Sequence, residues 1–350
     1  MRYLIAQQWD NIRGNHAGFP HICSLLEKNY PTYYTLIECP PLIKKERGLS
    51  IWSKVLKYYV DPYISKWYYK KDLRHRCYKM LNDLRSGDEV YLLEYNMPLT
   101  PQYQMAKFIK SHFKNVQVMA MTHLTPSKLL EFGITKEKLL KWDNCVDKHI
   151  TLGSSLSSYF ISIGIDEKKV STGFHAVDMD YYHPVEGSRD HSNLTVITMG
   201  ALQRDYTMLS EVVRKCPDVE WIICKGKKEV GSLFSNIPNV KIVGFVEEDE
   251  LRRLMSISDV SMSILEDTIG SNVITTSMAM GLAMVVSDVG SIRDYCDDSN
   301  ALFCNNSVNS FVEAINSLKD KARVDKMKKA SLSRVKRFSV ERTHEWFSSI

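Results

Sequence analysis

The sequence has no run of apolar residues near the roughly 18 that a membrane-spanning helix needs. Its eight cysteines include no Cys-x-x-Cys pair, so a zinc site is not indicated, and we expect buried free thiols in a reducing compartment. Internal repeats and low-complexity tracts are missing as well. The net charge of +5 is too small to indicate a nucleic acid partner. These absences leave an ordinary globular protein without a membrane span, a zinc finger or a repeat architecture.

What the sequence does contain is a regular alternation of apolar, strand-like runs with segments of helical length. In the first half these runs are 2–7, 35–39, 90–95, 116–123 and 148–154. In the second half they are 194–200, 220–226, 240–246, 259–265, 283–290 and 301–306. Strands separated by helices predict parallel sheets, so we expect an α/β protein with two doubly wound, Rossmann-like domains.

A polar segment containing Pro and Gly, PVEGSRDHSN at 184–193, interrupts the alternation and indicates a linker. We therefore place the first domain at residues 1–185 and the second at residues 186–335. A C-terminal segment, 336–350, follows them.

The most informative stretch is GSNVITTSMAMGLAMVVSDVGSIRD at 270–294. Gly270 and Ser271 open a helical segment, Gly281 ends it, and an apolar strand then runs into a Gly-containing turn. A helix N-terminus offers unpaired N–H groups and the positive end of the helix dipole, which together favour phosphate. The simpler alternative is that Ser271 is an ordinary N-cap, and the two roles are compatible.

Four motifs together resemble those of the GT-B glycosyltransferases, in particular family 4 (group 1 glycosyl transferases). They are GFHAVDMDYYHP (173–184), VITMGALQRDYTMLSEVV (196–213), VKIVGFVEEDELRRLMSISDVSMSIL (240–265) and the stretch 270–294. The resemblance implies a GT-B fold, with two Rossmann-like domains facing a cleft. It places the acceptor on the first domain and a nucleotide sugar on the second, with the C-terminal helix crossing back to the first. It also implies retention of anomeric configuration.

The resemblance assigns the donor site. The family's phosphate-binding Arg and Lys fall here at Ala201 and Tyr206, and Arg204 between them is our candidate for the diphosphate. In the family, main-chain groups after the third motif's strand hold the base. The residues we expect to bind the donor are Gly200, Arg204, Gly244, Phe245, Val246, Gly270, Ser271, Asn272 and Thr276.

The sequence departs from the family at its paired glutamates, which are replaced by Thr268 and Thr276. Thr276 retains a hydroxyl for the ribose, and Glu266 and Asp267 are candidate substitute carboxylates. The departure leaves the donor sugar and the stereochemical outcome open.

The remaining catalytic candidates lie in the first half. His123 ends a strand where the family has a loop histidine near the donor sugar, although a lone histidine is more often structural. In the loop after the first strand, Asp10, Arg13 and His16 are candidates for binding the acceptor or for general base catalysis. The alternative is that this loop is exposed to solvent and has no role in binding or catalysis.

Asp178-Met-Asp180 has the form of a metal-binding DxD motif, but its place beside Pro184 predicts a turn. We therefore expect no obligatory metal and no cofactor, with a UDP- or GDP-sugar as donor substrate.

Residues 44–85 contain twelve Lys or Arg against four Asp or Glu, interleaved with Trp and Tyr. Such a surface suits the headgroups of an anionic membrane. The alternative is that the aromatic rings pack on the sheet and the charges are solvated. The apolar run at the start of the chain is too short for a secretory signal. We therefore expect a cytoplasmic protein, peripheral at the inner face of the membrane.

The leading hypothesis is a hexosyltransferase-type glycosyltransferase that moves a sugar to a lipid-linked saccharide or glycolipid acceptor in surface polysaccharide biosynthesis. Two alternatives stay open. One is a non-catalytic GT-B homologue that binds a nucleotide or a partner. The other is a GT-B nucleotide-sugar epimerase, which the basic aromatic stretch disfavours because an epimerase needs no acceptor surface.

Overall fold

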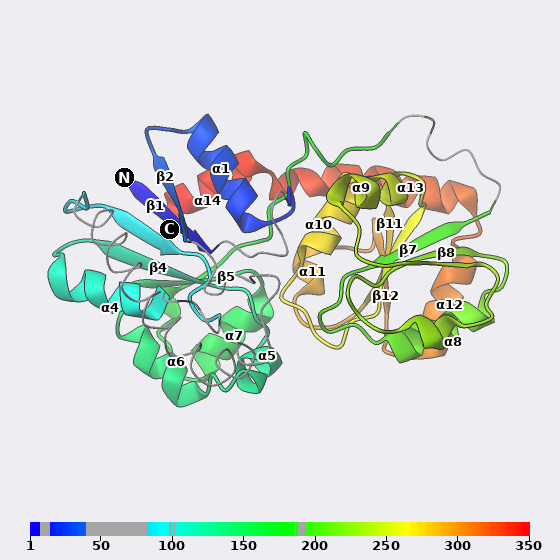
Figure 1. Ribbon diagram of the computed structural model, residues 1–350, viewed down its shortest axis with the longest axis horizontal. Coiled ribbons are helices and arrows are strands. Elements are labelled where there is room, and N and C mark those ends of the chain that lie inside the picture. The colour runs from blue at the N-terminus through cyan, green and yellow to red at the C-terminus, as the bar shows by residue number, and fades with distance from the viewer. Residues whose placement is uncertain (8–14, 40–82, 98–99, 101, 186, 188–192) are drawn as a thin grey trace, which may run out of the picture. The chain divides into compact units, whose positions relative to one another are not determined.

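The computed structural model describes residues 1–7, 15–39, 83–97, 100, 102–185, 187 and 193–350. They form two compact units, labelled by element in Figure 1. The first unit comprises Met1–Gly14, Gly18–Leu152 and Ser157–Thr172, and the second comprises Asn15–Ala17, Gly153–Leu156 and Gly173–Ile350.

The first unit contains a parallel sheet with strand order β2-β1-β3-β4-β5-β6. Its strands are β1 (Arg2–Gln7), β2 (Tyr34–Cys39), β3 (Glu89–Leu92), β4 (Gln117–Thr122), β5 (Lys148–Thr151) and β6 (Val170–Thr172). Its helices are α1 (Phe19–Asn29), α4 (Gln102–His112), α5 (Pro126–Glu131), α6 (Lys136–Asp143) and α7 (Ser154–Ser162), with a 3₁₀ turn at Glu167–Lys169. In Figure 1, α1 lies on one side of this sheet and α4 to α7 lie on the other.

The second unit contains a parallel sheet with strand order β12-β11-β10-β7-β8-β9. Its strands are β7 (Thr195–Met199), β8 (Glu220–Cys224), β9 (Val240–Val243), β10 (Val260–Ser263), β11 (Ala283–Ser287) and β12 (Ala301–Cys304). Its helices are α8 (Tyr206–Lys215), α9 (Glu248–Ser256), α10 (Asn272–Ala279), α11 (Ile292–Tyr295), α12 (Val308–Ser317), α13 (Lys321–Arg334) and α14 (Val340–Ser349), with 3₁₀ turns at Gly231–Phe234 and Val335–Phe338.

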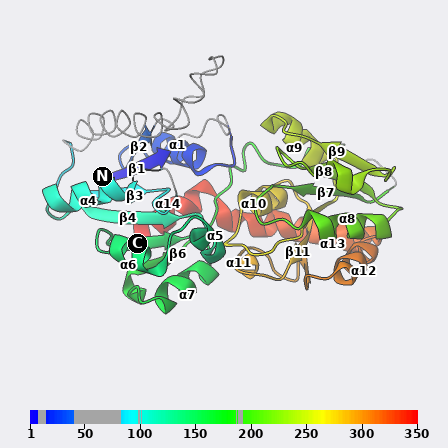
Figure 2. The same cartoon turned by 60° about the horizontal axis from the view of Figure 1, so that its bottom comes forward.

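Alternate residues of the second sheet enter separate cores on its two faces, as the two-residue period of a strand requires. In β7, Ile197 packs in a core with Leu254 of α9 and Ile274 of α10. Its neighbour Val196 packs in the opposite core, together with residues of α8 and α12. Figure 2 shows α9 and α8 on opposite sides of this sheet. The predicted α/β class with two doubly wound domains is therefore confirmed.

Each sheet has one point where the strand order reverses. In the second, the chain runs outward from β7 to β8 and β9, then returns to place β10 on the other side of β7. The first sheet reverses in the same way between β1 and β3. Loops that leave the carboxyl ends of the strands at such points diverge to opposite faces, and the crevice between them is where ligands bind in open α/β sheets.

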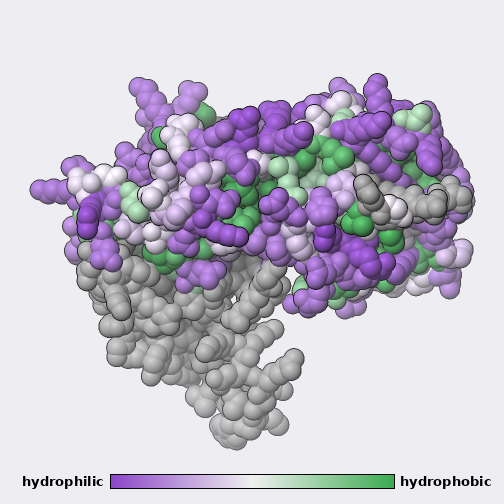
Figure 3. All heavy atoms as spheres, turned by 90° about the horizontal axis from the view of Figure 1, so that it is seen from above, coloured by the Kyte–Doolittle hydropathy of each residue, from purple (hydrophilic) through white to green (hydrophobic). Residues whose placement is uncertain are grey.

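The predicted strand runs all contain strands of the structure, but β6 was not predicted. Its three residues, Val170–Thr172, include a single large apolar side chain and so carry no periodic signal. The described cysteines are free thiols, and most are buried, as expected. No helix in the described part of the chain is long and apolar enough to cross a membrane. The face drawn in Figure 3 is mainly hydrophilic where it is coloured, with hydrophobic side chains between the polar ones.

Candidate functional site

The loops after β7 and β10 are joined at the switch point of the second sheet. Arg204 and Leu265 form an isolated antiparallel bridge between them. One residue further along, the N–H of Glu266 donates to the carbonyl of Gln203 over 3.1 Å. The two loops are therefore fixed to each other at the edge where a ligand is expected.

The loop after β7 turns sharply before α8 begins. Gly200 has φ of +90°, a conformation that favours glycine. The hydroxyl of Tyr206 donates to the carbonyl of Gly200 over 2.6 Å. Asp205 is the N-cap of α8, its carboxylate accepting from the N–H of Met208. Arg204 therefore lies inside a structured turn and is not a surface charge on the helix.

The guanidinium of Arg204 is half-buried and has unused donors. Its Nε donates to the carbonyl of Met199 over 3.1 Å. Within the described residues, Nη1 and Nη2 make no hydrogen bond and no carboxylate pairs with the cation. Burial lowers the pKa of Arg204 to about 10, so the side chain stays charged at neutral pH. A planar cation with free NH₂ groups is suited to the oxygens of a phosphate.

Gly200 places this cation beside the start of α10. A Cβ atom at Gly200 would lie 3.2 Å from Nη2 of Arg204 and 3.4 Å from Cγ2 of Val273. Val273 is the second residue of α10, so the guanidinium and the first turn of the helix flank the same glycine.

The first turn of α10 has polar groups without partners. Ser271 occupies the N-cap position, but its side chain makes no capping hydrogen bond. Its Oγ and the Oδ1 of Asn272 are buried without a partner among the described residues. The N–H groups of Asn272 and Val273 likewise donate to nothing in that set. Since the helix dipole adds positive potential here, this end of α10 has the free donors that an anion requires, and its predicted role in binding the donor stays a prediction.

Gly270 is required by the packing beneath this turn. Its φ is +90°, and a Cβ there would lie 2.1 Å from Cε2 of Tyr295. Tyr295 is itself buried, and its hydroxyl accepts from the N–H of His175 over 2.9 Å. The N–H of Gly270 donates to Oγ1 of Thr268 over 3.0 Å, which closes the loop.

Two further predicted residues lie in the same region. Thr276 is 5% exposed, and its hydroxyl donates to the carbonyl of Asn272 over 2.7 Å, so only its lone pairs remain for a ribose hydroxyl. Glu266, in the loop after β10, is exposed. The predicted roles of Thr276 toward the ribose and of Glu266 in catalysis stay predictions.

The segment after β9 carries an exposed aromatic ring. Gly244, Phe245 and Val246 follow the strand directly, and Phe245 is 57% exposed. The Nζ atom of Lys227, which follows β8, lies 5.2 Å from the centroid of the Phe245 ring. Because β9 is two strands from β7, this ring lies roughly 10 Å along the sheet edge from the Arg204 loop. That separation suits a base bound at one end and a diphosphate at the other.

His123 belongs to the first unit, where it follows β4 at the carboxyl edge of the sheet, as predicted. Burial lowers the pKa of its imidazole to about 4. The ring packs edge-on against Phe19, with centroids 5.2 Å apart. His123 is therefore neutral at physiological pH, and its role near a donor sugar stays a prediction.

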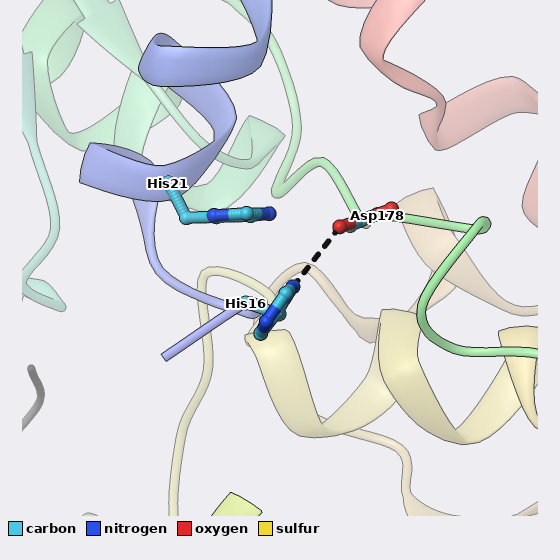
Figure 4. Close-up of side chains that lie close together, drawn as sticks. All are labelled: His16, His21 and Asp178. Carbon is cyan, nitrogen blue, oxygen red and sulfur yellow. Dashed lines mark hydrogen bonds and ion pairs between the residues drawn. The ribbon is translucent and has the colours of Figure 1, made fainter. Parts of the chain in front are cut away.

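His16 is counted with the second unit, as part of Asn15–Ala17. Its Nδ1 lies 3.2 Å from Oδ2 of Asp178, and its N–H donates to the carboxylate of Glu248 over 2.6 Å. Its ring stacks on Tyr181 with centroids 3.8 Å apart. Figure 4 shows the ring directed at Asp178; His21, also drawn there, belongs to the first unit. His16 is thus held on three sides, and its proposed role as a base stays a prediction.

Asp178 supports the predicted turn. Its Oδ1 accepts from the N–H groups of Asp180 and Tyr181, at 3.1 and 3.2 Å, which is the pattern of an Asx-turn. Asp10 lies outside the described residues, as does most of the basic aromatic stretch 44–85.

Sequence reasoning missed a buried polar cluster in the first unit. Glu94 and Asn96 follow β3, and Gln102 begins α4; all three are buried. The available signal was a glutamate near the end of the predicted strand 90–95, which puts a carboxyl group at the carboxyl edge of a parallel sheet. Its partner Gln7 is 87 residues away, so nothing local indicated that this carboxyl is buried.

The two parallel six-stranded sheets with their flanking helices define a GT-B fold. Sucrose-phosphate synthase from Thermosynechococcus elongatus aligns with a TM-score of 0.74 at 12% identity, over 100% of this chain and 99% of that one. Anabaena HepE in complex with UDP and glucose aligns with a TM-score of 0.69 at 13% identity, over 99% and 100%. The lipopolysaccharide outer core galactosyltransferase WaaB aligns with a TM-score of 0.68 at 12% identity, over 100% of both chains.

Residues 195–321, which carry Arg204 and α10, match the family described as "Glycosyl transferases group 1". This match over residues 195–321 agrees with the family that the resemblance of the motifs predicted. No curated protein matches the chain in sequence.

Proposed function

We propose that the protein transfers a sugar from a nucleoside diphosphate sugar to a saccharide acceptor. The observation that carries this proposal is the half-buried, unpaired Arg204 beside the unsatisfied first turn of α10. A cation and free amide N–H groups around one glycine provide complementary charge and donors for a diphosphate. The family of residues 195–321 supports the same reaction class.

The chemistry follows from where charge develops. The bond between the anomeric carbon and the diphosphate oxygen breaks, and the diphosphate leaves with the electron pair. The acceptor hydroxyl oxygen bonds to the anomeric carbon, and its proton passes to an oxygen of the leaving diphosphate or to solvent. Arg204 and the N–H groups of α10 stabilise the negative charge on the leaving diphosphate, and they are preorganised to do so. We therefore keep the proposal that transfer needs neither a metal nor a cofactor.

We propose a uridine diphosphate sugar as donor, with a GDP-sugar as the alternative. The structures of Anabaena HepE with UDP and with UDP-glucose support UDP. Phe245 at the end of β9 supports a stacked base, since an aromatic ring binds any base through its face. Identity to HepE is 13–14%, so the support extends to the nucleotide and not to the sugar.

We further propose that the acceptor is lipid-linked and that residues 44–85 bring the protein to the inner membrane face, as surface polysaccharide synthesis requires. The basic and aromatic composition of that stretch supports contact with anionic headgroups. The full-length protein should sediment with vesicles containing phosphatidylglycerol, and less so as salt rises. No sedimentation at low salt contradicts this part of the proposal and leaves the donor site untouched.

A panel of UDP-, GDP- and ADP-sugars tests the reaction, with binding followed by calorimetry and turnover by release of free nucleotide. The proposal expects one UDP-sugar to bind and to be hydrolysed slowly or transferred. Binding without turnover on any acceptor indicates a non-catalytic homologue. Interconversion of two sugars on the nucleotide indicates an epimerase. Absence of binding across the panel overturns the proposal.

A further inference from the structure

Glu94 is a buried carboxyl group at the switch point of the first sheet. It lies two residues after β3, between the ends of β1 and β4, and is 6% exposed. Its Oε2 accepts from the N–H of Gln7 over 3.0 Å and from Nε2 of Gln102 over 2.9 Å. This position is equivalent in topology to that of the loop after β10 in the second sheet, which is bridged to the Arg204 loop.

Gln102 fixes the geometry of this carboxyl. It is fully buried, and besides binding Oε2 it accepts from the N–H of Glu94 over 2.8 Å. Its Nε2 also donates to the carbonyl of Ile5 over 3.2 Å. Both the backbone and the side chain of Glu94 are therefore held by one residue, as in a preorganised site.

The other oxygen, Oε1, makes no hydrogen bond to the described residues. Burial raises the pKa of Glu94 to about 8, so the acid is mostly neutral at pH 7. Two N–H donors already occupy Oε2, and the proton must therefore sit on Oε1. Two titratable groups lie on the elements that pack around Glu94. One is the Cys23 thiol of α1, whose pKa is raised by burial and also by Glu94. The other is His123, which follows β4 and is neutral. Glu94 thus presents an O–H group whose hydrogen bond no described residue accepts.

Asn96, two residues after Glu94, also has a side-chain polar atom without a hydrogen-bond partner among the described residues. It is 1% exposed, and its Nδ2 donates to Oγ1 of Thr122 over 2.6 Å. Its Oδ1 is buried without a partner among the described residues. Turning the amide over exchanges its two atoms but still leaves one of them unpaired, at a cost of about 1–3 kcal/mol when it is desolvated. A ligand that hydrogen-bonds here removes that cost.

We propose that Glu94 and Asn96 bind hydroxyl groups of the saccharide acceptor, with Glu94 donating through Oε1 and Asn96 pairing through its free amide atom. The inference rests on the proposed function for the existence of such an acceptor. A sugar hydroxyl both donates and accepts, so it satisfies a carboxylic acid and an amide together. An apolar occupant would leave both groups without a hydrogen-bond partner.

The direct test follows the Glu94 carboxyl carbon by NMR in the full-length protein labelled with ¹³C-glutamate, the signal being assigned by its loss in Glu94→Gln. The probes are methyl β-glucoside and methyl β-galactoside. We expect a titration midpoint near pH 8 that moves upward with one of the glycosides, because the glycoside binds the protonated form. A midpoint that neither glycoside moves overturns the proposal.

Variants give a second readout. Glu94→Met removes the donor, and we expect glycoside affinity to fall about tenfold, while Glu94→Gln restores most of it at pH 7 because an amide N–H replaces the acid O–H. Glu27→Gln is the matched control, a glutamate of the same unit that accepts from the N–H of Leu36. Wild-type affinity in Glu94→Met contradicts the proposal.

UDP binding is measured separately and reports on the proposed function. Absence of UDP binding refutes that function. A loss of glycoside affinity that is confined to the Glu94 variants still identifies this subsite.

Discussion

Arg204 and Leu265 form a two-residue bridge that joins the loop after β7 to the loop after β10. Because these loops leave neighbouring strands toward opposite faces of the sheet, the bridge fixes the base of the crevice between them. It also holds the Arg204 side chain back against Gly200, beside α10. The groups that we propose to bind the diphosphate are therefore held close to one another by the fold itself.

Arg204→Ala should weaken UDP binding by about ten- to a hundredfold, since a charge-assisted hydrogen bond contributes about 1.5–3 kcal/mol. Calorimetry with UDP measures the change. The control is Arg253→Ala, whose guanidinium is exposed and paired with Glu250. Equal affinities in wild type and Arg204→Ala would refute the phosphate assignment.

Ser271→Ala and Ser307→Ala should give opposite results, although both serines are N-caps. Ser307 accepts from the N–H of Ser310, so its loss should lower the free energy of unfolding by about 1 kcal/mol and leave UDP binding unchanged. Ser271 makes no capping bond, so its loss should leave stability nearly unchanged and weaken UDP binding several-fold. Urea unfolding and calorimetry test the pair. A destabilised Ser271→Ala with normal affinity contradicts the expectation.

Phe245→Ala should weaken UDP binding by about tenfold and leave pyrophosphate binding unchanged, because base stacking contributes about 1–3 kcal/mol. The side chain is 57% exposed, so the fold should tolerate the change. Phe132→Ala, another exposed phenylalanine at 45%, is the control. An equal loss for UDP and pyrophosphate would show that the ring does not contact the base.

Gly270→Ala should lower the free energy of unfolding by about 1–3 kcal/mol, because alanine at φ +90° is strained and its Cβ collides with Tyr295. Thermal unfolding without ligand measures the effect. Gly231→Ala is the matched control, since a Cβ there meets nothing within 4 Å. A Tm for Gly270→Ala as high as that of the control contradicts the packing described for this turn.

Glu94 predicts a specific pH dependence of stability. Its pKa is raised from 4.5 to about 8, so between these values the folded chain keeps a proton that the unfolded chain has lost. The free energy of unfolding should therefore fall as pH rises from about 4.5 to about 8, by up to about 1.4 kcal/mol per pH unit.

His123 acts in the opposite sense. Its pKa is lowered from 6.5 to about 4, so its contribution rises with pH over that range and is constant above it. Between pH 6.5 and 8 the contribution of His123 is constant, so a pH dependence of the free energy of unfolding in this range reports on Glu94. Urea unfolding of wild type and Glu94→Gln between pH 6.5 and 8 should show a falling free energy of unfolding in the wild type alone. If the free energy of unfolding changes equally with pH in both proteins, Glu94 is not a buried neutral acid.

The sequence by itself determined the alternation of strands and helices, because buried parallel strands need apolar runs and the helices between them need capped, amphipathic segments. It also determined where α10 begins, since Gly270 and Ser271 are local signals for a helix start. It identified Arg204 as the phosphate candidate through spacing within a known motif.

Only the tertiary structure decided which of these groups are available to a ligand. Strand order sets the switch points, and it depends on contacts between residues far apart in the chain. Burial decides whether Ser271 caps its helix or stays unpaired. Burial also decides whether Glu94 is ionised in water or neutral beside Gln7 and Gln102. Burial comes from residues distant in sequence, so no local pattern of amino acids carries it.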